Sequence, residues 1–266
     1  QLVADKGTVI KPQHIMALAT VGIQKVNVLC KQKVAIITTG NELFNVKSGK
    51  LYSGAIFNSN KPFLKAYLNE LNCEPVFIGS CKDDEKALND LIDYSLLKEV
   101  KMIFSTGAVS MGKYDFIPTA LSKRGATIHF HKVKIRPGKP VLFAELANGT
   151  FYFGLPGNPL AAAACLRFFV TPFLSMISGL EYKNSIKAQL TSEINSKPGW
   201  RTFALAKASI NEHGQLQVEV LNDHGSYQSR FFTQSNCWVV IPENTESVSA
   251  GELIEIVPIN SNQVIS

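Results

Sequence analysis

Residues 102–116, MIFSTGAVSMGKYDF, contain the pattern that decides the fold. An apolar run ends in Ser105-Thr106-Gly107, a loop of small residues follows, and Asp115 stands where a helix is expected to begin. A strand that ends in such a loop before a helix is typical of a parallel α/β sheet, whose carboxyl edge presents hydroxyls and backbone N–H groups to an anion. The stretch therefore predicts an anion-binding loop in an α/β protein.

Two other loops share this character. TTGNEL (38–43) and GLPGNP (154–159) each follow an apolar run and contain glycine. Taken singly, each also fits a purely structural turn or helix start. Because the carboxyl ends of parallel strands meet at one edge of the sheet, we expect the three loops to form one pocket for a phosphorylated ligand. The residues expected to bind it are Thr39, Gly40, Asn41, Glu42, Ser105, Thr106, Gly107, Ser110, Gly112, Lys113, Pro156, Gly157 and Asn158.

A basic loop, KVKIRPGKP (132–140), is the main cluster of cations. Cations around a Pro-Gly turn suit contact with a phosphate or another oxyanion, although a charged run is also typical of a solvated edge strand. We expect Lys134, Arg136, Gly138 and Lys139 to bind substrate.

Three carboxylates are the best candidates for acid, base or metal chemistry. Asp83 and Asp84 open a predicted helix, where capping competes with catalysis as an explanation. Asp115 follows the anion loop, and we expect it to be catalytic and to bind magnesium. His129 and His131 alternate on one strand, but no third ligand has zinc-like spacing, so no zinc site is expected there.

Strand-like and helical runs alternate on both sides of residues 102–116. This alternation predicts a three-layer α/β domain with a mostly parallel sheet over 31–182. Short β-like pieces separated by turn residues follow, and they predict a small all-β barrel or sandwich over 183–266. Residues 1–30 are expected to form a lead-in helix and linker.

Composition narrows the function classes. The chain of 266 residues is 45% hydrophobic and carries a net charge of +6. This moderate excess suits an anionic ligand, whereas the lack of any basic run of five residues argues against nucleic acid. Five scattered cysteines without a C-x-x-C pair indicate a reducing cytosol. No signal peptide and no apolar run of about 18 residues is seen, so no membrane association is expected. The missing initiator Met fits an internal cut of a longer protein.

Together these segments resemble the molybdopterin molybdenumtransferase family, which includes MoeA and the gephyrin E domain. STGAVSMGKYD resembles the family pattern S-[ST]-G-G-V-S-x-G-x-x-D, with Ala108 in place of the second glycine, and TTGNEL resembles T-G-D-E-L. Residues 58–60 resemble the family pattern D-x-N, and 82–84 resemble R-D-D. Residues 136–140 resemble K-P-G-K-P, and 155–159 match L-P-G-N-P. Residues 224–226 and 235–242 resemble the family's β-barrel module.

The resemblance implies the molybdopterin-binding fold and an enzyme of molybdenum cofactor biosynthesis. Such an enzyme inserts molybdenum from molybdate into adenylylated molybdopterin and releases AMP in a step that depends on Mg²⁺. The resemblance also implies a cytoplasmic homodimer, with molybdoenzymes or the adenylyltransferase as candidate protein partners. The family's N-terminal module is not seen in this chain.

Several departures from the family pattern leave an alternative open. His14, Asn41 and Lys113 stand where the family carries acids, and Ala161 replaces a small hydroxyl residue. Losing carboxylates weakens magnesium binding, so a catalytically weakened molybdopterin-binding or scaffold protein is the second hypothesis. A pyrophosphatase of the CinA type and the sister adenylyltransferase share the expected fold, but their G-G-L-G-P-T and T-G-G-T-G loops are missing.

Overall fold

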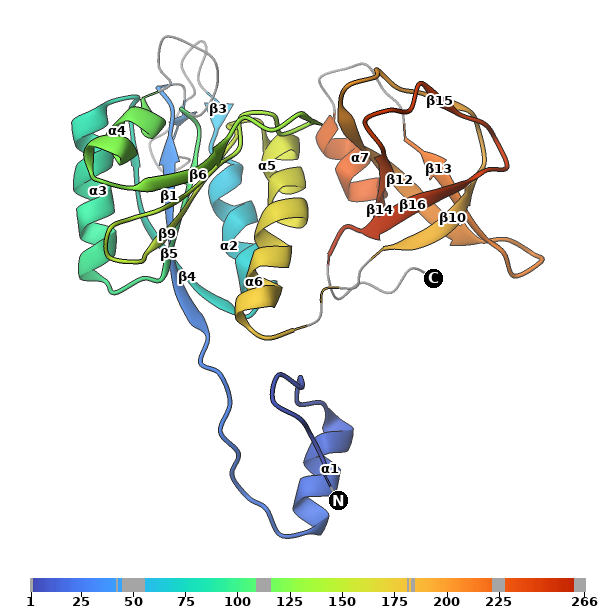
Figure 1. Cartoon of the computed structure of the whole chain (residues 1–266), viewed down its shortest axis with the longest axis horizontal. Coiled ribbons are helices and arrows are strands. Elements are labelled where there is room, and N and C mark those ends of the chain that lie inside the picture. The colour runs from blue at the N-terminus through green and yellow to red at the C-terminus, as the bar shows by residue number, and fades with distance from the viewer. Residues whose placement is uncertain are drawn as a thin grey trace.

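A central six-stranded sheet organises the first part of the chain (Figure 1), as seen in a computed structural model that describes residues 2–41, 43–44, 56–108, 116–180, 182, 185–221 and 228–260. Its order is β4-β1-β5-β9-β8-β6, and β4, β1, β5 and β9 run parallel, whereas β8 is antiparallel to both neighbours. The strands are β1 (Gln32–Thr39), β4 (Cys73–Cys81), β5 (Met102–Thr106), β6 (Thr127–His131), β8 (Leu142–Glu145) and β9 (Phe151–Leu155). The predicted α/β class with a mostly parallel sheet is confirmed.

Helices cover both faces of this sheet, which makes three layers (Figure 1). Strand β5 is buried at every position, as expected for a central parallel strand with both faces covered. Alternate residues of β1 point to opposite cores: Val34 and Ile36 to one, Ala35 and Ile37 to the other. The helices are α2 (Asn60–Glu70), α3 (Glu85–Leu97), α4 (Ile117–Lys123), α5 (Pro159–Cys165), the π-helical η2 (Leu166–Val170) and α6 (Thr171–Ile177).

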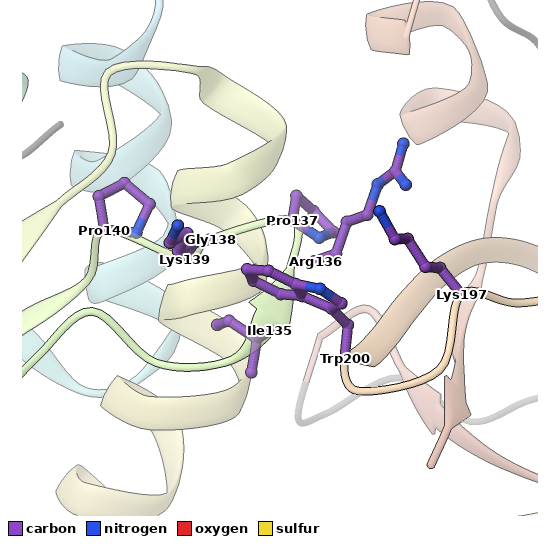
Figure 2. A pocket seen from close by; sticks show the side chains of 8 residues that line it. All are labelled: Ile135, Arg136, Pro137, Gly138, Lys139, Pro140, Lys197 and Trp200. Atoms are coloured by element: carbon purple, nitrogen blue, oxygen red, sulfur yellow. The ribbon is translucent and has the colours of Figure 1, made fainter. Parts of the chain in front are cut away.

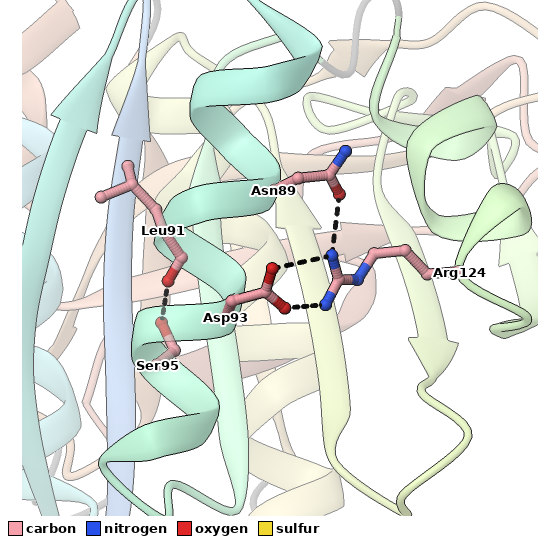
Figure 3. A network of polar contacts seen from close by, with 5 residues as sticks. All are labelled: Asn89, Leu91, Asp93, Ser95 and Arg124. Atoms are coloured by element: carbon pink, nitrogen blue, oxygen red, sulfur yellow. Dashed lines mark hydrogen bonds and ion pairs between the residues drawn. The ribbon is translucent and has the colours of Figure 1, made fainter.

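Helices α3 and α4 are joined by polar contacts on the outer face of the sheet (Figure 3). The guanidinium of Arg124, just after α4, forms an ion pair with Asp93 and donates a hydrogen bond of 3.2 Å to Asn89 Oδ1. At the N-terminal end of α3, Glu85 Oε1 lies 2.8 Å from Lys123 Nζ of α4. These pairs fix the helix that follows the 102–116 stretch.

The second part of the chain is a β-barrel. Strands β13, β10, β16, β14 and β12 pair in that order, and β13 also pairs with β12, which closes the ring. The predicted barrel is therefore confirmed. Its strands are β10 (Ile186–Leu190), β12 (Arg201–Ile210), β13 (Leu216–Val220), β14 (Cys237–Ile241) and β16 (Leu253–Pro258); a helix that the sequence did not predict, α7 (Gln228–Gln234), precedes β14. The exact domain boundaries given above stay a prediction.

The α/β part and the barrel are joined by one strand and by a common hydrophobic cluster. Strand β7 (Ile135–Arg136), from the basic loop, adds to the barrel beside β12 in parallel. The rings of Phe168 in η2 and Phe203 in β12 stack with centroids 3.7 Å apart. The remaining short strands are β2 (Leu43–Phe44), β3 (Ile56–Phe57), β11 (Ile194–Asn195) and β15 (Ser247–Val248).

Helix α1 (Pro12–Thr20) confirms the predicted lead-in helix and has no buried residue. Figure 1 places it beyond the end of the sheet where β1 begins, opposite to the end where the candidate loops lie. Its His14 accepts a hydrogen bond of 3.0 Å from the Lys11 backbone N–H, so in this chain His14 serves the helix start and lies away from those loops.

One helical run, Pro159–Ile177, is long and apolar enough to span a membrane by length and composition alone. It is not an unbroken apolar run, because the buried Arg167 lies within it. Of an 18-residue window in this run, 56% is buried within the fold, as in a core helix.

Candidate functional site

Four neighbouring parallel strands end level at one edge of the sheet. Thr38 of β1 pairs with Thr106 of β5, Thr106 with Leu155 of β9, and Thr39 with Cys81 of β4. The loops after these strands therefore begin side by side, which is where open α/β sheets bind ligands.

The three predicted loops meet at Gly107. Its backbone N–H donates to Leu155 O at 3.2 Å, and Thr39 Oγ1 donates to Thr106 O at 3.2 Å. Gly107 has φ +92°, and a Cβ there would lie 2.2 Å from Thr39 O. A Cβ on Gly157 would lie 3.6 Å from the Gly107 Cα. The bends after β1, β5 and β9 are thus packed backbone against backbone.

The hydroxyls predicted to contact a ligand have a different environment from the one expected. Thr39, Ser105 and Thr106 are at most 3% exposed. Thr39 donates within the fold, and Ser105 lies inside the sheet. These side chains hold the edge together rather than face solvent. In the third loop, Gly157 and Asn158 are exposed, and Pro156 is buried.

Ala108 follows Gly107 in the left-handed region, with φ +48°. This conformation costs an L-residue other than glycine about 1 kcal/mol or more. We expect Ala108→Gly to raise the free energy of unfolding by about 0.5–1 kcal/mol, measured by urea denaturation. Ala126→Gly, outside a left-handed position, is the control and should not stabilise; a loss of stability in Ala108→Gly would contradict the expectation.

Residues just before and at the start of α2 also contribute to this edge. The sequence indicated them only through the resemblance of 58–60 to the family pattern D-x-N. Asn58 Nδ2 donates to Thr38 Oγ1 at 2.8 Å, and Thr38 Oγ1 lies 2.6 Å from Ser80 Oγ. Asn60 Nδ2 donates to Gly157 O at 2.8 Å. Asn60 is 7% exposed, and its buried Oδ1 has no hydrogen-bond partner in the described structure. Asn60 therefore clamps the loop after β9.

Replacing this clamp should loosen the edge. Asn60→Asp removes the donor and turns a carboxylate toward the Gly157 carbonyl, so we expect the free energy of unfolding to fall by about 1–3 kcal/mol. Urea denaturation measures this effect. Asn69→Asp, on the exposed face of the same helix, is the matched control. Equal stability of the two variants would contradict the role of Asn60 as a clamp.

Asn158 caps α5, as the L-P-G-N-P pattern predicted. Its Oδ1 accepts from Ala161 N–H at 3.2 Å, and Pro159 occupies the first turn. Because α5 continues through η2 into α6, the positive end of a long helix dipole lies at the candidate edge.

The two predicted acids after β4 differ in role. Asp84 Oδ1 accepts from Ala87 N–H at 2.7 Å and caps α3. Asp83 Oδ2 accepts from Asn41 Nδ2 at 3.1 Å, which brings the loop after β4 against the loop after β1. Asp84 was predicted to be catalytic, but one oxygen of its carboxylate is already used in this cap.

Replacing Asp84 tests whether this residue stabilises α3 as its N-terminal cap. Asp84→Ala should lower the free energy of unfolding by about 1 kcal/mol, because α3 loses its N-terminal acceptor. Asp84→Asn keeps an acceptor without the charge and should restore most of that stability. Chemical denaturation measures both; equal stability of Asp84→Ala and the parent protein would contradict the capping role.

The described residues do not by themselves form a magnesium site. No group of three His, Cys, Asp or Glu side chains able to hold a metal occurs among them. Asp84 is committed to its helix cap, and we derive no step through a metal ion. Glu42, Ser110, Gly112, Lys113 and Asp115 lie outside the described residues, so their predicted roles, including metal binding by Asp115, stay predictions.

The basic loop lines a cavity of about 380 Å³ between the α/β part and the barrel (Figure 2). Its cations are Arg136, Lys139 and Lys197, and among the described residues none of the three forms an ion pair. The other lining residues are Ile135, Pro137, Gly138, Pro140 and Trp200. Figure 2 shows the side-chain ends of Arg136 and Lys197 close to each other, with Lys139 on the other side of Trp200. Like charges repel one another, and an oxyanion bound among them would relieve that repulsion.

Lys134 and Gly138 of the basic loop also make structural contacts, and their predicted role in substrate binding stays a prediction. Lys134 lines a neighbouring groove rather than this cavity, and its carbonyl accepts from Arg201 N–H at 3.1 Å. Gly138 has φ +111°, and a Cβ there would lie 2.8 Å from Cys165 Sγ, so glycine lets the loop lie against α5.

Helix α5 links the basic cavity to the edge of the sheet. The Gly138 Cβ position lies 3.6 Å from Ala161 O, and Ala161 is in the first turn after the Asn158 cap. At 1.5 Å per residue, these two α5 positions are about 5 Å apart along the helix axis. The structure therefore brings Gly138 of the basic loop close to the end of α5 that lies at the loop edge, while the basic cavity and the loop edge stay separate.

Known proteins resemble the chain over nearly its whole length. Residues 35–176 match the family described as "Probable molybdopterin binding domain", and 187–259 match "MoeA C-terminal region (domain IV)". A molybdopterin molybdenumtransferase of Haemophilus influenzae is 33% identical over 263 residues, covering 97% of this chain and 64% of the relative. One of Synechococcus elongatus is 31% identical over 252 residues, covering 94% and 61%.

A solved structure agrees with these relatives. A molybdopterin biosynthesis MoeA protein from Pyrococcus horikoshii superimposes with a TM-score of 0.82 at 28% identity, covering 98% of this chain and 63% of that chain. The chain thus spans a little under two thirds of the length of each of these proteins.

Proposed function

The chain belongs to the MoeA family of molybdopterin molybdenumtransferases, and from that premise we propose that it acts in molybdenum cofactor biosynthesis. The proposed reaction transfers molybdenum from molybdate into adenylylated molybdopterin and releases AMP. Both substrates carry oxyanions, and the reaction needs them to be held close together.

The observation that carries this proposal is the arrangement around α5. The packed bends at Gly107 and Gly157 lie at its N-terminal end, and Gly138 of the basic loop packs against α5, 3.6 Å from Ala161 O in the first turn. Arg136 and Lys139, on either side of Gly138 in the sequence, line the neighbouring cavity. We assign the phosphates of the adenylylated substrate to backbone groups at the loop edge, because the hydroxyls there are buried. We assign molybdate to the cavity of Arg136, Lys139 and Lys197.

The described residues support catalysis by positioning and charge neutralisation. Burial raises the pKa of the Cys73 and Cys81 thiols to about 11, and burial likewise raises the pKa of Cys165, so these thiols are protonated and poor nucleophiles at neutral pH. Cations and helix N-termini at fixed positions lower the barrier by binding the charge on both oxyanions.

Magnesium dependence, a homodimer and a cytoplasmic location belong to the same proposal. All five cysteines are free, which supports a reducing compartment. Molybdoenzymes or the adenylyltransferase are the protein partners that the family membership suggests. The relatives are named as transferases, which favours the enzyme over the binding-only alternative.

An AMP-release assay tests the proposal. The purified chain is mixed with adenylylated molybdopterin and molybdate, with magnesium or with a chelator, and AMP is quantified by chromatography. We expect release that requires both molybdate and magnesium. Binding of the substrate without any AMP release would support the binding-only alternative, and failure to bind any molybdopterin form would reject both.

A further inference from the structure

Trp200 is a barrel residue that faces the basic loop across the cavity (Figure 2). Lys139 Nζ lies over its indole ring, 5.3 Å from the centroid. Both neighbours of Trp200 are held by backbone hydrogen bonds: Gly199 N–H donates to Glu243 O at 2.7 Å, and Arg201 N–H donates to Lys134 O at 3.1 Å. The indole is therefore fixed by the barrel on one side and by the basic loop on the other.

An indole holds a lysine in a way that suits an anion site. A carboxylate would also orient the ammonium, but it would neutralise the charge and compete with an incoming oxyanion. A ring face attracts the cation through its quadrupole and leaves the positive charge available. It also restricts a long side chain that otherwise samples many rotamers.

From this contact we infer that Trp200 is a positioning residue for oxyanion capture, acting through Lys139. The inference rests on the proposed function, because it takes the cavity to be the molybdate site. It adds that the barrel contributes to this site: Trp200 and Lys197 come from the barrel, whereas Arg136 and Lys139 come from the loop that pairs with it through β7.

Calorimetric titration of the whole chain with sodium molybdate tests the inference. Trp200→Leu removes the ring and should weaken molybdate binding about two- to fivefold, the range expected for a cation–π contact of this kind. Trp200→Phe keeps a ring and should recover most of the affinity. In a Lys139→Met background, Trp200→Leu should have no further effect, because its target is gone.

A matched control uses a similar pair far from the cavity. Lys98 Nζ lies 5.0 Å from the Tyr94 ring on α3, and Tyr94→Leu should leave molybdate affinity unchanged. Thermal melting checks that each variant is folded; if Trp200→Leu does not fold, Trp200→Met, which also removes the ring, replaces it in the comparison with and without Lys139→Met. Equal loss from the Trp200 substitution in the presence and absence of Lys139 would overturn the inference.

The outcomes separate this inference from the proposed function. If the parent protein binds no molybdate, the assignment of molybdate to the cavity fails, and the role of Trp200 fails with it. If the parent protein binds molybdate and Trp200→Leu binds it equally well, the role of Trp200 fails and the assignment stands.

Discussion

Gly107→Ala should weaken AMP binding at least about tenfold and strongly destabilise the protein. The new Cβ would lie 2.2 Å from the Thr39 carbonyl oxygen, and the position has φ +92°. Neither backbone can yield without separating the loops after β1, β5 and β9, so we expect a loss of about 3 kcal/mol or more in the free energy of unfolding. AMP affinity should fall by at least about tenfold in whatever fraction folds.

Gly125→Ala is the matched control for this change. Gly125 also has a positive φ, +72°, but a Cβ there would meet nothing within 4 Å. It should therefore show only the left-handed backbone penalty of about 1 kcal/mol and unchanged AMP binding. Similar losses of AMP affinity in both variants would show that the close approach at Gly107 is not needed.

Neutralising the basic cavity should have the second large effect. Arg136→Met combined with Lys139→Met keeps much of the apolar lining but removes two of the three cations. Charge-assisted hydrogen bonds contribute about 1.5–3 kcal/mol each, so we expect the KM for molybdate in AMP release to rise by about tenfold or more. The affinity for AMP should change much less, because the loop edge is intact.

Lys207→Met provides the control for net charge. Lys207 is exposed on β12 and does not line the cavity, so its loss should leave the KM for molybdate unchanged. A rise in AMP Kd as large as the rise in molybdate KM in the double variant would contradict the separate assignment of the two oxyanions.

The sheet and its loop edge could be predicted from the sequence because their signals are local. Strand β5 begins with an apolar run and ends at Thr106, just before Gly107, and β9 ends at Leu155, two residues before Gly157. One topological rule then places both loops at the same edge. Asn158 was predicted correctly as a cap. Gly107, expected to leave its backbone N–H free for an anion, instead donates it to Leu155 O and is the point where the loops pack together.

The partners of these residues could not be predicted in the same way. That Asn60 reaches Gly157, and that Trp200 faces Lys139, depends on how helices and barrel pack across long sequence separations. The short strand β7 forms only because β12 offers an edge beside it. The environment of Thr39 could not be predicted either. A hydroxyl side chain suits ligand contact, but this one is buried and joins β1 to β5 by donating to Thr106 O.

The crystal structure of the protein with AMP and molybdate tests the central claim most directly. Anomalous scattering at the molybdenum edge would locate the metal oxyanion, and the density of AMP would locate the phosphate. We expect molybdenum among Arg136, Lys139 and Lys197, and the AMP phosphate against the backbone of 107–108 and 157–158, at the same end of α5. Ligands bound on different faces of the molecule, or away from both groups of residues, would contradict the account.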